Sequence, residues 1–189
     1  VGTVTEVYDY LRLLFARAAD AYSYVSGEKM VQYTDDQIID LILKDYADQK
    51  VLVLAPMVNN RKGHYKELFE TIRRKGYLHV RVDGEVMEIT PGMKLDRYKN
   101  HTIEVVVDRL KLKGENEEDL KRLRATVDKA MTQGDGVMAV CAHSAQFRER
   151  SQASYSLEVK GDGIRYFSRH LMCPTTGMSY AEPAPHTFS

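Results

Sequence analysis

The chain has 189 residues, with 27 Lys and Arg against 27 Asp and Glu, and 43% of its residues are hydrophobic. This length suits one domain with an appendage, and the hydrophobic share is too high for a disordered chain. A net charge of zero provides no overall field to attract DNA, and no apolar run approaches the roughly 20 residues that cross a bilayer. Two cysteines, Cys141 and Cys173, make a poor disulfide framework and favour a reducing, cytoplasmic compartment.

Two capping boxes predict helices in the first part of the chain. Thr3 pairs with Glu6 in the first box, and Thr34 pairs with Gln37 in the second. Apolar residues follow each box at helical spacing, so each box is expected to begin an amphipathic helix.

The middle of the chain predicts a strand, a helix and a hairpin. The run 50–55 is apolar after Lys50 and stops at Pro56, as a buried strand would. Residues 61–75 carry apolar side chains at helical spacing and are followed by Gly76. The next apolar positions alternate on either side of Asp83-Gly84, a hairpin turn signal.

The second half predicts further strands and one long helix. Strands are expected at 101–110 and 137–141, a helix at 117–133, and a hairpin over 154–168. The predicted fold class is therefore α/β (α+β), a compact mixed sheet of about five strands with helices packed on one face. The remaining segments would form a helical or loop stem.

Catalytic signatures are missing from the sequence. It has no GxxxxGK[ST] phosphate loop and no GxGxxG, and its six histidines follow no HxH or HExxH spacing. We therefore predict no catalytic residue and no cofactor-binding residue in this chain.

Several blocks together resemble one protein family. They are RKG at 61–63, DGE at 83–85 and HTIEVVVDR at 101–109, flanked by VGTVTEVYDYLRLLFARA at 1–18 and CPTTGMSYAEPAPHTFS at 173–189. Their order and content resemble the UvrA family, around its UvrB-binding domain. UvrA is the damage-recognition ATPase of the excinuclease complex in bacterial nucleotide excision repair.

This resemblance implies a division of the chain. Residues 1–30 would be a stem from ATP-binding domain I, residues 31–150 the UvrB-binding domain, and residues 151–189 the return to ATP-binding domain I. It also implies a parent protein, a homodimer, that binds ATP with Mg, zinc and DNA. The chain itself would be a non-catalytic module that docks UvrB.

The resemblance also implies which residues meet UvrB. In the family, basic residues on the sheet pair with UvrB acids, and Arg109 in the HTIEVVVDR block is the position that matches best. We add Arg81, and His79, which stands where the family usually has a basic residue. Arg61 and Lys62 of the RKG block complete the set. The alternative is that these side chains form the solvated face of half-buried strands.

The zinc motif of the family is degenerate in this chain. Where relatives carry Cys-x-x-Cys pairs, this sequence has Ser23 and Ser26, then Cys173 and Thr176. Hydroxyls are poor zinc ligands beside thiolate or imidazole, so no metal is expected here.

Two other functions stay open at this point. One is a DNA-contacting accessory module of a UvrA-like ABC ATPase, although the basic clusters near 73–75, 121–124 and 148–150 have acids close by in the sequence. The other is an unrelated small-molecule enzyme, which the missing phosphate loop disfavours.

Overall fold

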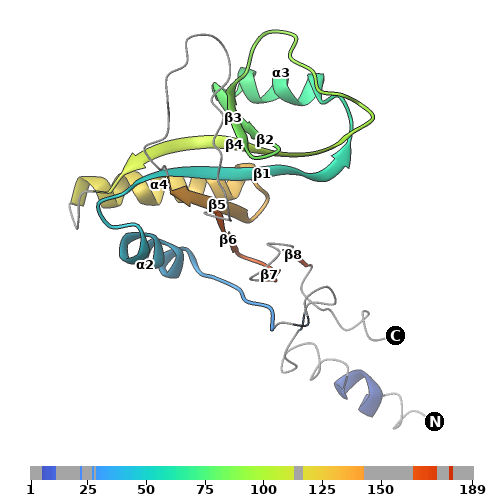
Figure 1. The fold of residues 1–189 in the computed structure, drawn as a ribbon. Coiled ribbons are helices and arrows are strands. Elements are labelled where there is room, and N and C mark those ends of the chain that lie inside the picture. The colour runs from blue at the N-terminus through green and yellow to red at the C-terminus, as the bar shows by residue number, and fades with distance from the viewer. Residues whose placement is uncertain are drawn as a thin grey trace. The chain divides into compact units, whose positions relative to one another are not determined.

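The computed structural model describes residues 6–11, 22, 27, 29–112, 117–142, 164–173 and 179–180. The chain forms two compact units, one of Val1–Tyr33 with Ser168–Ser189 and the other of Thr34–Phe167 (Figure 1). Most of the predicted hairpin over 154–168 and most of the segment 173–189 lie outside the described residues. Among the helices described, none is long and apolar enough to cross a membrane.

The larger unit is built on a six-stranded antiparallel sheet with the strand order β3-β2-β4-β1-β5-β6. Its strands are β1 Lys50–Lys62, β2 His79–Val82, β3 Glu85–Glu88, β4 Asn100–Lys111, β5 Val137–Ala142 and β6 Ile164–Ser168. Its helices are α2 Asp35–Asp45, α3 Lys66–Arg74 and α4 Glu117–Gln133. The predicted α/β class is confirmed, with one strand more than expected and with antiparallel pairing.

The smaller unit holds a short two-stranded sheet of β7 Leu171–Met172 and β8 Ser179–Tyr180. Its backbone also pairs Tyr33 with Ser168, through a hydrogen bond of 2.9 Å from the Tyr33 N–H to the Ser168 carbonyl. These two residues bracket the Thr34–Phe167 unit.

β1 is longer than its sequence predicted, because Pro56 does not end it. Pro56 lies opposite Glu104 of β4, and the strand continues to Lys62. On its other side β1 pairs with β5 only from Val51 to Leu54. Pro56 therefore lies where the described strands pair with β1 on one side only, which is the kind of position at which strands tolerate proline.

The helix predicted for residues 61–75 begins later than expected, for a similar reason. Arg61 and Lys62 still pair with His101 and Asn100 in the sheet, so α3 starts at Lys66. The predicted end is correct, since Gly76 follows the last turn with a φ of 91°.

Alternation along the strands assigns each residue to one of two faces. On one face, Phe69 and Ile72 of α3 pack on Ala55, Ile103 and Val105. Farther along the same face, Asp108 accepts a hydrogen bond of 3.0 Å from Thr126 of α4. Helices α3 and α4 thus cover one face of the sheet, as predicted.

Local sequence signals also placed α2 and α4 correctly. Thr34 and Gln37 form the predicted capping box, with the Gln37 N–H donating to Thr34 Oγ1 at 3.3 Å and the Thr34 N–H donating to Gln37 Oε1 at 3.0 Å. α4 spans the predicted 117–133. Arg124 of α4 bonds to Asp36 of α2 at 2.9 Å and ties the two helices together.

Candidate partner-docking site

The sheet face opposite α3 and α4 mixes a small apolar cluster with charged side chains. We call it the open face because α3 and α4 cover the other one, although its apolar residues are buried. Its apolar residues are Leu52, Leu54, Val86, Val106, Ala139 and Cys141, with Ile164 and Tyr166 packed against them. By the same alternation, His79 and Arg81 of β2 and Glu104 and Arg109 of β4 belong to this face. Three of the five predicted partner residues therefore share one surface.

Arg109 lines a hollow at one end of the two longest strands. It lies opposite Leu52 in the β1–β4 register, and its side chain is exposed. The hollow has a volume of about 300 Å³, and its lining residues are Lys50, Val51, Leu52, Arg109, Leu110 and Lys111. Three cations around this hollow suit a partner residue that carries a carboxylate.

His79 lies close enough to Arg109 for their charges to interact. It is half-buried and faces Glu88 across the β2–β3 hairpin. Burial lowers the pKa of His79 below its usual 6.5, and the positive charge of Arg109 lowers it further, while Glu88 opposes both. At neutral pH the free protein therefore holds this imidazole uncharged.

Arg81 forms an ion pair with Glu104 within the sheet. Its Nη1 donates to Oε1 of Glu104 at 3.0 Å, and the two side chains are only 12% and 1% exposed. Arg81 Nε and Glu104 Oε2 are buried and have no hydrogen-bond partner among the described residues. The solvated-face alternative therefore does not describe Arg81, whose charge is largely withdrawn from solvent.

Arg61 and Lys62 lie at the other end of β1. Nine residues separate Leu52, beside Arg109, from Arg61, which is about 30 Å at a rise of ~3.3 Å per residue. Both basic side chains are exposed. The structure therefore divides the predicted residues into an Arg109–His79 group and a distant Arg61–Lys62 pair.

Comparison with known proteins gives this arrangement a family. A family model described as the UvrA interaction domain matches residues 33–144, which is more than half of the chain. The chain belongs to the UvrA interaction domain family.

Three relatives of this UvrA interaction domain carry the same name. UvrABC system protein A is 38% identical to the chain in Methanothermobacter thermautotrophicus, 37% in Bacillus subtilis and 35% in Deinococcus radiodurans. Each alignment covers 100% of this chain but only 18%, 18% and 17% of the relative. The chain therefore spans less than a fifth of the relatives it matches, and the resemblance found in its sequence is confirmed.

The degenerate zinc positions are only partly described in this UvrA interaction domain chain. Cys173 is fully buried and is not part of a disulfide. Ser23, Ser26 and Thr176 lie outside the described residues. No cluster of three or more potential metal ligands occurs among the residues that are described. The expectation that the chain binds no zinc stays a prediction.

Sequence reasoning missed three residues of the open face and its hollow. Lys50 and Lys111 face each other across the β1–β4 register and join Arg109 around the hollow. Glu104, inside the EVVV block, is the buried counter-ion of Arg81. Glu104 could have been found from the sequence, because it is a charged residue inside an apolar strand. The positions of Lys50 and Lys111 beside Arg109 could be found only from the register of β1 and β4.

Proposed function

We propose that this UvrA interaction domain docks UvrB through the open face, with Arg109 as its main contact. The observation that carries the proposal is the grouping of Arg109 with Lys50 and Lys111 around one hollow, with His79 near Arg109. An acidic partner side chain entering the hollow would lose water in exchange for charge-assisted hydrogen bonds. Such complementarity sets the association rate and the register of a complex.

The test is calorimetric titration of the chain with UvrB. Arg109→Glu removes the cation and adds repulsion, so binding should weaken by about 2 kcal/mol or more, roughly 30-fold. Lys129→Glu makes the same change in charge on the exposed side of α4 and should leave the affinity unchanged. Equal affinity for the Arg109 variant and the unmodified chain, with the fold intact by circular dichroism, would remove Arg109 from the interface.

The pH dependence of the same titration reports on His79. A partner carboxylate beside His79 would raise the lowered pKa of the imidazole, so that binding takes up a proton. Affinity should therefore increase as pH falls below about 6.5. A His79→Arg variant, charged at every pH, should lose this dependence.

At the level of the parent protein, we propose a role in nucleotide excision repair in the cytoplasm. The shared name of the relatives supports this role. ATP hydrolysis, zinc binding and dimer formation would belong to the rest of the parent, and this chain would be a non-catalytic recruiting module. An absence of ATP turnover by the isolated chain would be consistent with that division.

A further inference from the structure

The second basic group of the Thr34–Phe167 unit is larger than its sequence suggested. The end of β1 and the loop between β3 and β4 lie together, because Arg61 and Lys62 pair with His101 and Asn100, and the Leu95 N–H donates to the His64 carbonyl at 2.9 Å. In Figure 1 this loop curves past the end of β1 and the start of α3. We call this surface the basic end, and its cations are Arg61, Lys62, Lys66, Lys94, Arg97 and Lys99.

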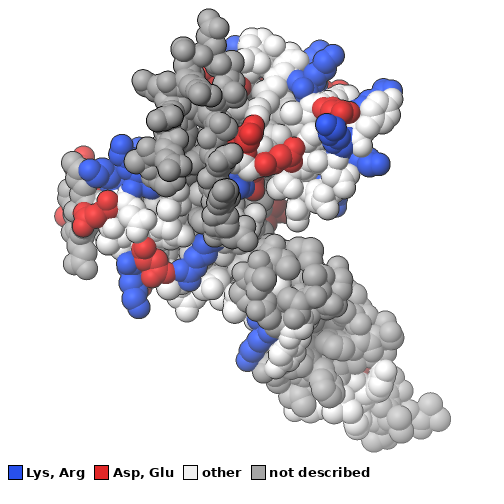
Figure 2. Space-filling model, viewed as in Figure 1, with Lys and Arg blue, Asp and Glu red and all other residues white. Residues whose placement is uncertain are grey.

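The basic end concentrates positive charge in a chain that is neutral overall. Residues 61–66 and 94–99 contain six cations and one carboxylate, Asp96, with Glu67 next along the chain. All six basic side chains are exposed. Lys and Arg side chains project at this end of the molecule in Figure 2.

These cations differ from four other arginines of the larger unit in how they are paired. Arg81, Arg122, Arg124 and Arg165 each have a carboxylate partner within the larger unit. Among the described residues, no salt bridge involves a cation of the basic end.

The nearby carboxylates are occupied by other donors. Asp96 accepts the Tyr98 N–H at 3.0 Å, and Asp83 accepts the Thr102 N–H at 2.8 Å and bonds to His101 at 2.6 Å. Because six cations stand against Asp96 and Glu67 in these two segments, the basic end keeps a net positive charge.

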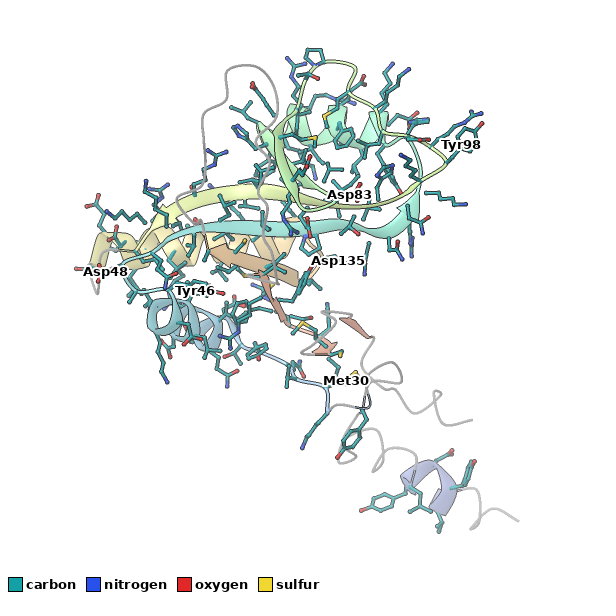
Figure 3. The ribbon with its side chains drawn as sticks, in the orientation of Figure 1. Met30, Tyr46, Asp48, Asp83, Tyr98 and Asp135 are labelled. Atoms are coloured by element: carbon teal, nitrogen blue, oxygen red, sulfur yellow. The ribbon has the colours of Figure 1, made fainter. Side chains whose placement is uncertain are left out.

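An exposed aromatic ring lies among these charges. Tyr98 is 69% exposed and points away from the sheet in Figure 3. The Arg97 guanidinium carbon lies 4.7 Å from the centre of its ring, in a cation–π contact. The sequence Arg97-Tyr98-Lys99 thus interleaves an aromatic side chain with two cations, as surfaces that contact nucleic acid do.

The backbone beneath Arg61 and Lys62 is fixed by local packing. The Tyr65 hydroxyl lies 2.9 Å from the Arg61 carbonyl and 3.1 Å from the Lys62 carbonyl. A Cβ added to Gly63 would lie 2.9 Å from Cζ of Tyr65, so only glycine allows this close approach. The two cations are therefore presented from an ordered turn.

We propose that the basic end is a sequence-independent binding surface for the phosphate backbone of DNA. Four of its six cations are lysines, which are depleted in the cores of protein interfaces but suit phosphates as mobile point charges. All six are exposed, and none of them lines the Arg109 hollow. Contacts to phosphates place a protein on the duplex without reading its sequence.

The experiment measures binding of the 189-residue chain to a fluorescent DNA duplex by anisotropy, over a range of salt concentrations. Non-specific binding in the range of ~10⁻⁶–10⁻⁴ M is expected, with log K falling linearly against log salt. About four phosphate contacts would give a slope near −3.6. Arg97→Ala/Lys99→Ala should weaken binding at least tenfold and make the slope shallower by about two.

A matched control distinguishes binding through the basic end from an effect of the total positive charge of the chain. Lys121→Ala/Arg124→Ala removes the same two residue types from α4, and it should leave both the affinity and the slope close to those of the unmodified chain. The same variants are titrated with UvrB, and Arg97→Ala/Lys99→Ala should bind it with unchanged affinity.

Three results would overturn the proposal. The first is no DNA binding at low salt, and the second is equal loss in both double variants. The third is a loss of UvrB binding in Arg97→Ala/Lys99→Ala without an effect on DNA, which would assign the basic end to an acidic protein partner. Circular dichroism and melting of each variant exclude unfolding as the cause of any loss.

Discussion

The Arg81–Glu104 pair allows a sharp test of how buried charge acts in this sheet. Its side chains are 12% and 1% exposed, and a single hydrogen bond of 3.0 Å joins them. Arg81 Nε and Glu104 Oε2 are buried without hydrogen-bond partners among the described residues. Removing an ion from water costs several kcal/mol, and one contact recovers only part of that free energy.

Two substitutions with opposite expected effects follow from this geometry. Glu104→Gln keeps the shape but leaves the Arg81 charge buried and uncompensated, so the free energy of unfolding should fall by about 3–5 kcal/mol. Arg81→Met/Glu104→Leu removes both charges and should be neutral, or stabilising by about 1–4 kcal/mol. The double variant should therefore be several kcal/mol more stable than the single variant.

The measurement is urea denaturation followed by circular dichroism, because the chain has no Trp. A double variant as unstable as Glu104→Gln would show that the pair is a net source of stability and refute the reasoning. An Arg81→Met variant adds a check through pH. Burial raises the pKa of Glu104, and loss of Arg81 removes the main opposing effect. Since a raised folded pKa favours the protonated form, stability should fall as pH rises from acid towards neutrality.

Three further predictions concern the core, a buried histidine and zinc. Phe69 of α3 is 1% exposed, and Phe69→Ala should lower the free energy of unfolding by about 3–5 kcal/mol. Leu78→Ala, at an exposed position, should lower it by under ~0.5 kcal/mol in the same urea titration. The hydrogen bond to Asp83 raises the pKa of His101. The stability that His101 adds should therefore be complete below pH ~6.5 and decline as pH rises through the folded pKa. A His101→Gln variant whose melting temperature depends on pH in the same way as that of the unmodified chain would contradict this. Elemental analysis of the purified chain should find no stoichiometric zinc, and one zinc per chain that disappears with Cys173→Ser would overturn that expectation.

Local signals in the sequence were sufficient for elements whose limits are set within a few residues. The capping box at Thr34 and the acidic start of α4 fixed the beginning of each helix. The Asp83-Gly84 turn was also correct, because both residues adopt positive φ angles, 51° and 94°. Such a turn needs little information from the rest of the chain.

Long-range pairing decided what the sequence did not predict. Pro56 continues its strand because β5 pairs with β1 only through Leu54, and α3 begins late because Arg61 pairs with His101, 40 positions away. The cations of the basic end come from segments about 30 residues apart that only the β1–β4 register brings together. The same register places Lys50 and Lys111 around Arg109, so its hollow was invisible in the one-dimensional pattern.

The backbone hydrogen bond between Tyr33 and Ser168 has a consequence for how such a domain can be transferred from one protein to another. Because the chain enters and leaves the Thr34–Phe167 unit at adjacent points, two neighbouring backbone positions connect this unit to the rest of the chain. A host fold need only provide two neighbouring backbone positions to receive it. A lineage could therefore gain, lose or exchange the unit without rebuilding its host, and an engineer could graft it onto an unrelated scaffold by the same two joints.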